Sequence, residues 1–194
     1  MAKRRKTDKS QSGRLRIVAG NWRSRLLDIA DVPGLRPTSE RIRETLFNWL
    51  APRIRGSRCL DLFAGTGVLG LEALSRGARS VVFVECSRRA VKTLRENIKA
   101  LAADGAVVLQ MDALNYLEQD CEEQFDLVFL DPPFAAEMLD ELCRLLAERQ
   151  VLAEDACVYL EQDRSNPEPD LPEGWRIVKN KTAGNVRYML EQNA

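Results

Sequence analysis

The segment Asp131-Pro132-Pro133-Phe134 places an acid, two rigid residues and an aromatic ring directly after a predicted buried strand. Two successive prolines fix an extended turn, so the Asp131 carboxylate and nearby backbone carbonyls would form a fixed set of hydrogen-bond acceptors beside the Phe134 ring. This arrangement suits a planar base with an exocyclic amino group. The base stacks on the ring, the amine donates its two hydrogens, and its lone pair turns toward an electrophile. A hydride-transfer enzyme has no use for such a turn.

A glycine-rich segment, Asp61-Leu62-Phe63-Ala64-Gly65-Thr66-Gly67-Val68-Leu69-Gly70, follows the first strand of the predicted sheet and opens a helix. Ligands of open α/β sheets bind at that edge. We expect Gly65 and Gly67 to let the backbone approach a ligand, at positions where a Cβ would occupy ligand space. The spacing G-x-G-x-x-G also fits a dinucleotide site, or a turn with a purely structural role.

Two acids follow the next two predicted strands. Glu85 lies 20 residues after Gly65, where a carboxylate can accept hydrogen bonds from both hydroxyls of a ribose. It would serve NAD or S-adenosylmethionine (SAM) equally, and an ordinary surface glutamate remains an alternative. Asp112, followed by Ala113, could accept a hydrogen bond from an adenine amino group or simply cap a helix.

Composition excludes several other mechanisms. The sequence has no histidine, which excludes the Ser-His-Asp triad, the Cys-His dyad and His-ligated metal sites. Its five cysteines form no C-x-x-C pair, so we expect reduced thiols, mostly in the core, in a cytoplasmic protein without a metal. No apolar run of 18 residues predicts a membrane span, and the basic N-terminus lacks the apolar segment of a secretory signal.

The net charge of zero conceals an asymmetry between the two parts of the chain. Residues 1–55 hold 14 Lys and Arg against 5 Asp and Glu, a balance of +9, whereas residues 56–194 hold 15 against 24, a balance of −9. A basic segment joined to an acidic body indicates a polyanionic partner at one end. We therefore expect a flexible basic tail over 1–13, an N-terminal unit over 14–55 that faces the substrate, and a catalytic domain over 56–194.

Turn and cap signals predict the elements of the N-terminal unit. Two strand-like runs flank Gly20-Asn21, which predicts a β-hairpin over 14–29 with an arginine-rich face. Thr38 is the expected N-cap of a helix that Pro52 closes. Its apolar spacing leaves Arg41 and Arg43 away from the packed face.

Alternating strands and helices follow from Gly56. Strands are predicted at 58–63, 80–85, 106–110, 125–130 and 156–161, with helices at 88–101, capped by Ser87, and about 135–149. This order predicts a doubly wound, mostly parallel α/β sheet. Runs at 175–180 and 185–191 are too close for a parallel crossover, so they form a hairpin that places an antiparallel strand near one edge.

The motifs together resemble a known family. DLFAGTG, Glu85 and DPPF are similar to class I SAM-dependent methyltransferases that modify exocyclic amines of bases. RIVAGNWRSRLL, GLRPTSERIRETLFNWL and LDLFAGTGVLGLEALSRGA resemble the bacterial 16S ribosomal RNA guanine-N2 methyltransferases, over about residues 14–190. Phe134 replaces the tyrosine common in DNA adenine methylases, and Ser24 stands where many relatives have glycine.

The resemblance implies a Rossmann-like, seven-stranded fold and an enzyme that methylates 16S rRNA in the 30S subunit with SAM. A monomer is the default expectation for such a chain. The implied SAM site comprises Asp61, Phe63, Ala64, Gly65, Thr66, Gly67, Glu85, Cys86, Asp112 and Ala113. The implied catalytic turn comprises Asp131, Pro132, Pro133 and Phe134. The candidate RNA contacts are Arg14, Arg16, Arg23, Arg25, Arg36, Thr38 and Arg41.

Three alternatives stay open. A DNA adenine-N6 methylase, or an amine methylase of another RNA, shares the chemistry but usually carries a target-recognition insert for which 194 residues leave little room. An NAD-dependent oxidoreductase shares Gly65, Gly67 and Glu85 but gives no reason for the DPPF turn. A non-catalytic RNA-binding assembly factor would keep the basic segment without needing an intact SAM pocket.

Overall fold

The computed structural model describes residues 13–30, 32, 38–119, 123–132 and 136–193. Two elements form an N-terminal hairpin, β1 (Arg14–Arg16) and β2 (Leu26–Asp28), and α1 (Glu40–Leu50) follows. The remaining elements are β3 (Arg58–Asp61), α2 (Val68–Ser75), β4 (Ser80–Val84), α3 (Arg88–Leu101), β5 (Ala106–Leu109), α4 (Ala113–Glu118), β6 (Phe125–Leu130), α5 (Ala136–Glu148), β7 (Leu152–Asp163), β8 (Arg176–Ala183) and β9 (Val186–Gln192).

Within the described residues, seven strands form one sheet in the order β5-β4-β3-β6-β7-β9-β8. Neighbours from β5 to β7 pair in parallel, whereas β9 is antiparallel to both β7 and β8. The predicted doubly wound fold, its C-terminal hairpin and the antiparallel strand near one edge are therefore confirmed. The strand order reverses between β3 and β6, which is where ligands of such sheets bind.

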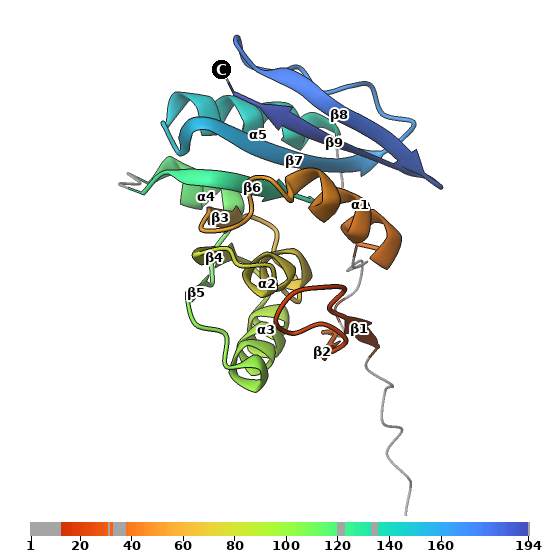
Figure 1. Cartoon of the computed structure of the whole chain (residues 1–194). Helices are drawn as coiled ribbons and strands as arrows, with labels where there is room; N and C mark the ends of the chain where they lie inside the picture. The colour runs from red at the N-terminus through yellow and green to blue at the C-terminus, as the bar shows by residue number, and fades with distance from the viewer. Residues whose placement is uncertain (1–12, 31, 33–37, 120–122, 133–135, 194) are drawn as a thin grey trace, which may run out of the picture.

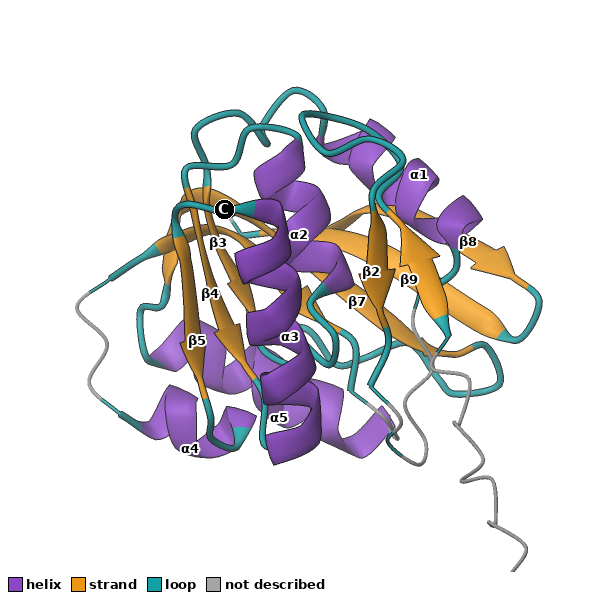
Figure 2. Ribbon diagram, turned by 90° about the horizontal axis from the view of Figure 1, so that it is seen from below, coloured by secondary structure: helices purple, strands orange, loops and turns teal. Residues whose placement is uncertain are grey.

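Helices cover both faces of the sheet and enclose two apolar cores. On one face, α1, α2, α3 and the β1–β2 hairpin pack over residues such as Phe83, Phe129 and Tyr159. On the other face, α4 and α5 pack over Leu130 and Leu160 (Figures 1 and 2). Burial on both faces explains why the central strands have apolar runs without alternation.

Helix α2 connects the hairpin to the sheet. All eight of its residues are buried, including the carboxylate of Glu72. This carboxylate accepts hydrogen bonds from the backbone N–H groups of Val18 (2.8 Å) and Ala19 (3.0 Å) in the hairpin loop. Arg43 of α1 and Arg76 at the end of α2 donate to it at 3.3 and 2.8 Å.

Ser75, also on α2, completes this attachment. Its carbonyl accepts from Asn21 N–H at 2.7 Å, and its hydroxyl donates to Ala19 O at 2.6 Å. Gly20 has a φ of +84°, and a Cβ there would lie 1.9 Å from the Ser75 carbonyl oxygen. The hairpin loop therefore needs glycine at this position in order to reach α2.

Two predictions for α1 are wrong. The N-cap is Ser39, whose hydroxyl accepts from Ile42 N–H, whereas the Thr38 side chain faces the sheet. Arg43 does not lie away from the packed face, because its side chain is 0% exposed and pairs with the buried Glu72. A charge can be buried in this way when an opposite charge and hydrogen bonds accompany it.

Other expectations are confirmed with small changes of boundary. Ser87 caps α3, which spans the predicted 88–101, and Cys59, Cys143 and Cys157 are buried core thiols. Cys86 is exposed, and Cys121 lies outside the described residues. No helix in the described part of the chain is long and apolar enough to cross a membrane.

Candidate active site

The carboxyl ends of four adjacent strands bring acidic side chains to one edge of the sheet. Asp61 ends β3, Glu85 follows β4, Asp131 follows β6, and Glu161 lies near the end of β7. The register pairs Asp61 with Phe129 and Leu130 with Leu160, which places these strand ends level with one another. The edge thus gathers the acids predicted from the glycine-rich segment and from the DPPF turn.

The turn after β3 depends on glycine for two different reasons. Gly65 and Gly67 have φ values of +54° and +79°, in the left-handed region that glycine adopts without strain. At Gly67, however, a Cβ would lie 2.2 Å from Leu94 Cδ1 in the core. The expectation that a Cβ at Gly67 would fill ligand space is therefore wrong, because this position faces α3.

Gly70 fills the third position of the glycine pattern and lets α2 pack closely on the sheet. A Cβ there would lie 2.2 Å from the ring of Phe83. Its N–H donates to Asp61 Oδ2 at 3.1 Å, so Asp61 is directed toward the first turn of α2. Burial of the Asp61 carboxyl raises its pKa to about 7, although this hydrogen bond lowers it.

Glu85 is held in a defined orientation by the backbone around it. Gly65 N–H donates to Oε2 at 2.8 Å, and Ser87 N–H donates to Oε1 at 2.6 Å. A carboxylate has about four lone-pair sites, so two such bonds leave acceptor capacity for a ligand. The adjacent Cys86 is an exposed residue, but partial desolvation of its thiol and the Glu85 charge raise the pKa of that thiol.

Asp112 caps α4, as one of its two predicted roles requires. Its Oδ1 accepts from Leu114 N–H at 2.9 Å and from Asn115 N–H at 3.3 Å. Both bonds end on Oδ1. Among the described residues none donates a hydrogen bond to Oδ2, so Oδ2 can accept one from a ligand. The Asp112 charge also raises the pKa of the Cys86 thiol, which indicates that the two side chains are near each other.

The other predicted SAM-site residues lie mostly buried next to this edge of the sheet. Ala64, Thr66 and Ala113 are buried, and Phe63 is partly buried against the core that α4 and α5 cover. The Thr66 carbonyl accepts from Asn97 Nδ2 of α3 at 3.4 Å. These contacts fix the loop between β3 and α2.

Asp131 is partly buried and bonded to the N-terminal unit. Thr38 Oγ1 donates to Asp131 Oδ2 at 3.2 Å, across 93 residues of sequence. Burial and the Glu161 charge raise the pKa of Asp131 well above its usual range, whereas the Thr38 hydrogen bond lowers it. Pro132 is buried, and Pro133 and Phe134 lie outside the described residues.

Glu161 and its hydrogen-bond partner Tyr159 also belong to this edge, although the motifs did not predict them. The Glu161 carboxyl accepts from the Tyr159 hydroxyl at 2.7 Å, and both side chains are buried. Burial raises the pKa of Glu161, while hydrogen bonds with Tyr159 and Thr38 lower it. The one signal in the sequence was an acid directly after the apolar run 156–160 of β7, level with the end of β6.

The predicted RNA-contacting arginines differ in their surroundings. Arg16, Arg23 and Arg41 are exposed. Arg14 pairs with Asp28 at 3.1 Å, and the Arg25 guanidinium donates to the Ala100 carbonyl at 3.0 Å. Arg36 lies outside the described residues.

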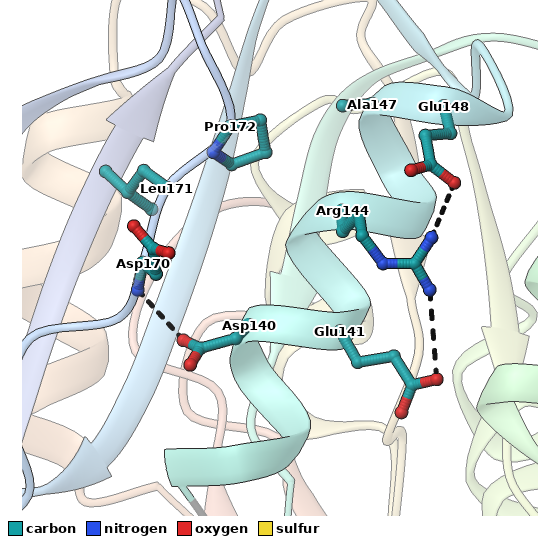
Figure 3. Close-up of a pocket in the computed structure, with 8 residues that line it drawn as sticks. All are labelled: Asp140, Glu141, Arg144, Ala147, Glu148, Asp170, Leu171 and Pro172. Atoms are coloured by element: carbon teal, nitrogen blue, oxygen red, sulfur yellow. Dashed lines mark hydrogen bonds and ion pairs between the residues drawn. The ribbon is translucent and has the colours of Figure 1, made fainter.

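A groove of about 560 Å³ runs along α5 but contains none of the predicted site residues. It is lined by Asp140, Glu141, Arg144, Ala147, Glu148, Asp170, Leu171 and Pro172 (Figure 3). Arg144 pairs with Glu148 at 2.6 Å and with Glu141 at 4.0 Å, and Asp170 N–H donates to Asp140 Oδ1 at 2.9 Å. The charged side chains that line the groove therefore largely form ion pairs and hydrogen bonds with groups of the groove itself. In the described residues, no cluster of three or more His, Cys, Asp or Glu could hold a metal ion.

Comparison with known proteins assigns the family. Residues 15–192 match a family model described as "Conserved hypothetical protein 95". The chain belongs to this family. It is 44% identical to ribosomal RNA small subunit methyltransferase D of Escherichia coli K12, over 97% of this chain and 94% of that protein. The Haemophilus influenzae protein of the same name is also 44% identical, over 93% of this chain and 95% of that protein.

Solved structures agree with this membership. An Escherichia coli protein, yhhF, described as a candidate methyltransferase, superposes with a TM-score of 0.86 and 42% identity, covering 93% of this chain and 98% of that one. These relatives confirm the resemblance to an rRNA methyltransferase family that RIVAGNWRSRLL, GLRPTSERIRETLFNWL and LDLFAGTGVLGLEALSRGA indicated.

Ser24 has a backbone conformation that is unusual for a residue with a side chain. This residue has a φ of +68°, a conformation that costs a non-glycine residue about 1–2 kcal/mol. It lies in the hairpin loop, where its N–H donates to the Ile17 carbonyl at 2.9 Å. A glycine at this position would adopt the same loop without that strain.

Proposed function

We propose that this protein transfers a methyl group from SAM to the exocyclic N2 of a guanine in 16S rRNA. The substrate is the assembled 30S subunit, and the enzyme acts as a cytoplasmic monomer. The observation that carries the proposal is the Asp131 carboxyl, which Thr38 holds at the edge shared with the glycine turn and Glu85.

The residues at this edge fit SAM. Glu85 keeps acceptor capacity for two ribose hydroxyls, and Asp112 Oδ2 can accept from the adenine amine. The residues that would hold SAM are Asp61, Phe63, Ala64, Gly65, Thr66, Gly67, Glu85, Cys86, Asp112 and Ala113. When bound, SAM supplies a methyl group on a positively charged sulfur.

The chain's own contribution is alignment and proton acceptance. Asp131 and the backbone of its turn accept hydrogen bonds from the guanine amine and direct its lone pair toward the methyl group. Holding the reacting atoms in line can supply much of the rate enhancement. Asp131 then receives the proton that leaves the methylated amine, a role usually worth about 10²–10⁴-fold.

Access to the guanine amine requires an unpaired or flipped base, because a stacked and paired guanine hides its N2 from a pocket. The exposed arginines Arg16, Arg23 and Arg41 would contact phosphates around that base. The Thr38 contact with Asp131 supports this assignment, because it joins the N-terminal unit directly to the catalytic turn.

Two measurements separate this function from the alternatives. Calorimetry should detect binding of SAM and S-adenosylhomocysteine but not of NADH; the reverse pattern would overturn the methyltransferase proposal. Incubation with labelled SAM and 30S particles, followed by mass spectrometry of nucleosides, should identify N2-methylguanosine. A parallel incubation with duplex DNA tests the adenine-N6 alternative, which N6-methyladenine in the DNA would favour. Transfer to neither the particles nor the DNA would favour an assembly factor.

The role of Asp131 is testable by substitution. Asp131→Asn keeps the shape and one acceptor but loses the charge, so it should slow single-turnover methylation without abolishing it. Asp131→Ala should be nearly inactive, and both variants should bind SAM as the wild type does. The matched control is Asp126→Asn, at the opposite end of β6, where the carboxylate accepts from Arg58 N–H. A wild-type rate for Asp131→Ala would make Asp131 structural.

A further inference from the structure

Two carboxyl groups face each other across β6 and β7. The parallel register Leu130↔Leu160 makes Asp131 and Glu161 the next neighbours along the two strands. Phe129 and Tyr159, two residues earlier, both point into the core beneath α1, so the alternation of side chains sends the two acids to that same face. The Glu161 charge is close enough to raise the pKa of Asp131.

The Thr38 hydroxyl lies between these two acids. It donates to Asp131 Oδ2 at 3.2 Å and lies near enough to the Glu161 carboxyl to lower the pKa of Glu161. A hydroxyl has one hydrogen and two lone pairs, so it can accept from one carboxyl while it donates to the other. When Thr38 donates to Asp131, the shared proton is on Glu161; when the hydroxyl turns and accepts from Asp131, the proton is on Asp131. The Thr38 backbone is fixed in turn, because Arg43 Nε donates to its carbonyl at 3.2 Å.

The surroundings favour a single proton on the two acids. Thr38 is 3% exposed and Glu161 8%, so water solvates their polar groups poorly. Asp61 on β3 adds negative charge that raises the pKa of Asp131 further. The Tyr159 phenol remains protonated, because burial and the Glu161 charge raise its pKa, and Tyr188 of β9 acts in the same direction. Arg43 is the buried cation nearby, and its charge is paired with Glu72.

We propose that Asp131 and Glu161 share one proton, which the Thr38 hydroxyl passes to Glu161 when the guanine amine binds; this role rests on the proposed function. The amine donates hydrogen bonds to Asp131, which favours its charged form and moves the proton to Glu161. The N–C bond then forms as the C–S bond breaks and its electrons stay on sulfur. The proton leaving N2 goes to Asp131. Both acids are then neutral until one proton returns to water. Glu161 acts through Asp131 and is a positioning residue.

The shared proton can be observed without RNA or SAM by infrared spectroscopy of protonated carboxyl groups. At neutral pH, Glu161→Gln and Asp131→Asn should each remove the same single acid band, and the double variant should remove no more than either one. Glu191→Gln is the control, because this buried acid lies on the opposite face of the sheet. Its effect should add to that of Glu161→Gln. Retention of the band in Glu161→Gln would overturn the proposal, because Asp131 would then hold its proton alone.

The role of Thr38 is tested by the pH dependence of single-turnover methylation on 30S particles. Thr38→Val removes the hydroxyl, so the proton can no longer move from Asp131 to Glu161 and only the fully deprotonated pair of acids can react. The acid limb of the rate–pH profile should therefore move up by about one pH unit or more. Thr38→Ser should behave as the wild type. In the Glu161→Gln background no proton needs to move, so Thr38→Val should no longer shift the limb. An equal shift in both backgrounds would mean that Thr38 only hydrogen-bonds Asp131.

The two proposals can fail separately. A wild-type enzyme that does not methylate guanine N2 would refute the proposed function, while the infrared experiment would still decide whether the two acids share a proton. A wild-type enzyme that methylates guanine N2, together with an acid band retained in Glu161→Gln, would refute the shared proton alone.

Discussion

Individual acids in this protein have different environments, although several are equally buried. Asp61, Glu85 and Glu161 accept hydrogen bonds from named donors, and Asp131 accepts one from Thr38. Glu191 of β9 differs, because neither of its side-chain oxygens has a hydrogen-bond partner among the described residues, and the side chain is 0% exposed. Burial raises its pKa to about 7, and the Glu168 charge adds to this effect.

This environment predicts a pH-dependent cost at Glu191. The folded pKa of Glu191 lies above its unfolded value of about 4.5, so the folded state binds this proton more tightly. The stability that this proton gives to the folded state is fully present below pH 4.5 and is lost as the pH rises toward 7. A shift of this size corresponds to about 3 kcal/mol. Glu191→Met, which removes the carboxyl at similar volume, should therefore have a higher free energy of unfolding than the wild type at pH 8.

Urea unfolding at pH 5 and pH 8 measures this effect. The difference between Glu191→Met and the wild type should be small at pH 5 and large at pH 8. Glu118→Met, at an exposed position on α4, is the control and should show no such change with pH. An equal difference at both pH values would mean that Glu191 is charged throughout or has a partner in solution.

At the scale of elements, close packing between α2, α3 and β4 explains the glycine pattern better than ligand contact alone. Gly67 and Gly56 share a φ of +79°, but only Gly67 would place a Cβ against a neighbour, at 2.2 Å from Leu94 Cδ1. Gly56 has open space around that position. The two positions therefore separate backbone strain from crowding.

We predict that Gly67→Ala lowers the free energy of unfolding by about 1–3 kcal/mol more than Gly56→Ala does, which is the usual cost of an overpacked core. Combining Gly67→Ala with Leu94→Ala should recover much of that difference, because the crowding atom is removed. Chemical denaturation of the wild type, Gly67→Ala, Leu94→Ala and the double variant gives the coupling between the two positions. Equal losses at Gly67 and Gly56 would show that only the backbone conformation matters.

Periodicity and turn chemistry predicted these elements well, whereas contacts distant in sequence were not predictable. The strands, α3 with its Ser87 cap and the C-terminal hairpin follow from local patterns. Thr38 was wrongly expected to be the cap because Ser39 beside it is an equally good capping residue. The burial of Arg43 depends on Glu72, 29 residues away in an otherwise apolar helix.

The candidate site likewise contains residues that local patterns predicted and residues that only the fold reveals. Short motifs located Gly65, Glu85 and Asp131, because a motif records which residues follow the end of a strand. Glu161 was missed, because its function depends on the pairing of β7 with β6, which no local pattern encodes. The direction of a Cβ at Gly67 likewise depends on where α3 packs.

At the scale of the whole molecule, charge is divided between a basic N-terminal part and an acidic remainder, +9 over residues 1–55 and −9 over 56–194. The exposed cations Arg16 and Arg23 lie in the β1–β2 hairpin, on the side of the sheet that carries α1 and Thr38 (Figure 1). RNA is therefore expected to approach from this side.

Arg16→Ala and Arg23→Ala should each weaken RNA binding and reduce the slope of log K against log salt by about one unit for each phosphate that is no longer neutralised. SAM affinity should stay the same, because neither residue belongs to the predicted SAM site. Titration of 30S particles at several salt concentrations gives the slope, with Arg144→Ala on α5 as the control. An unchanged slope in both hairpin variants would exclude the hairpin from RNA binding.

The bonds that Glu72 accepts have a consequence for modularity. The hairpin loop, α1 and α2 all donate to this one carboxylate, and Ser75 exchanges hydrogen bonds with the same loop. A chimera that took the first 55 residues from another methyltransferase would keep a buried anion but could lose its donors, at a cost of about 3–5 kcal/mol. Exchange of substrate-facing segments between such enzymes would thus succeed only if the hairpin, α1 and α2 were exchanged together.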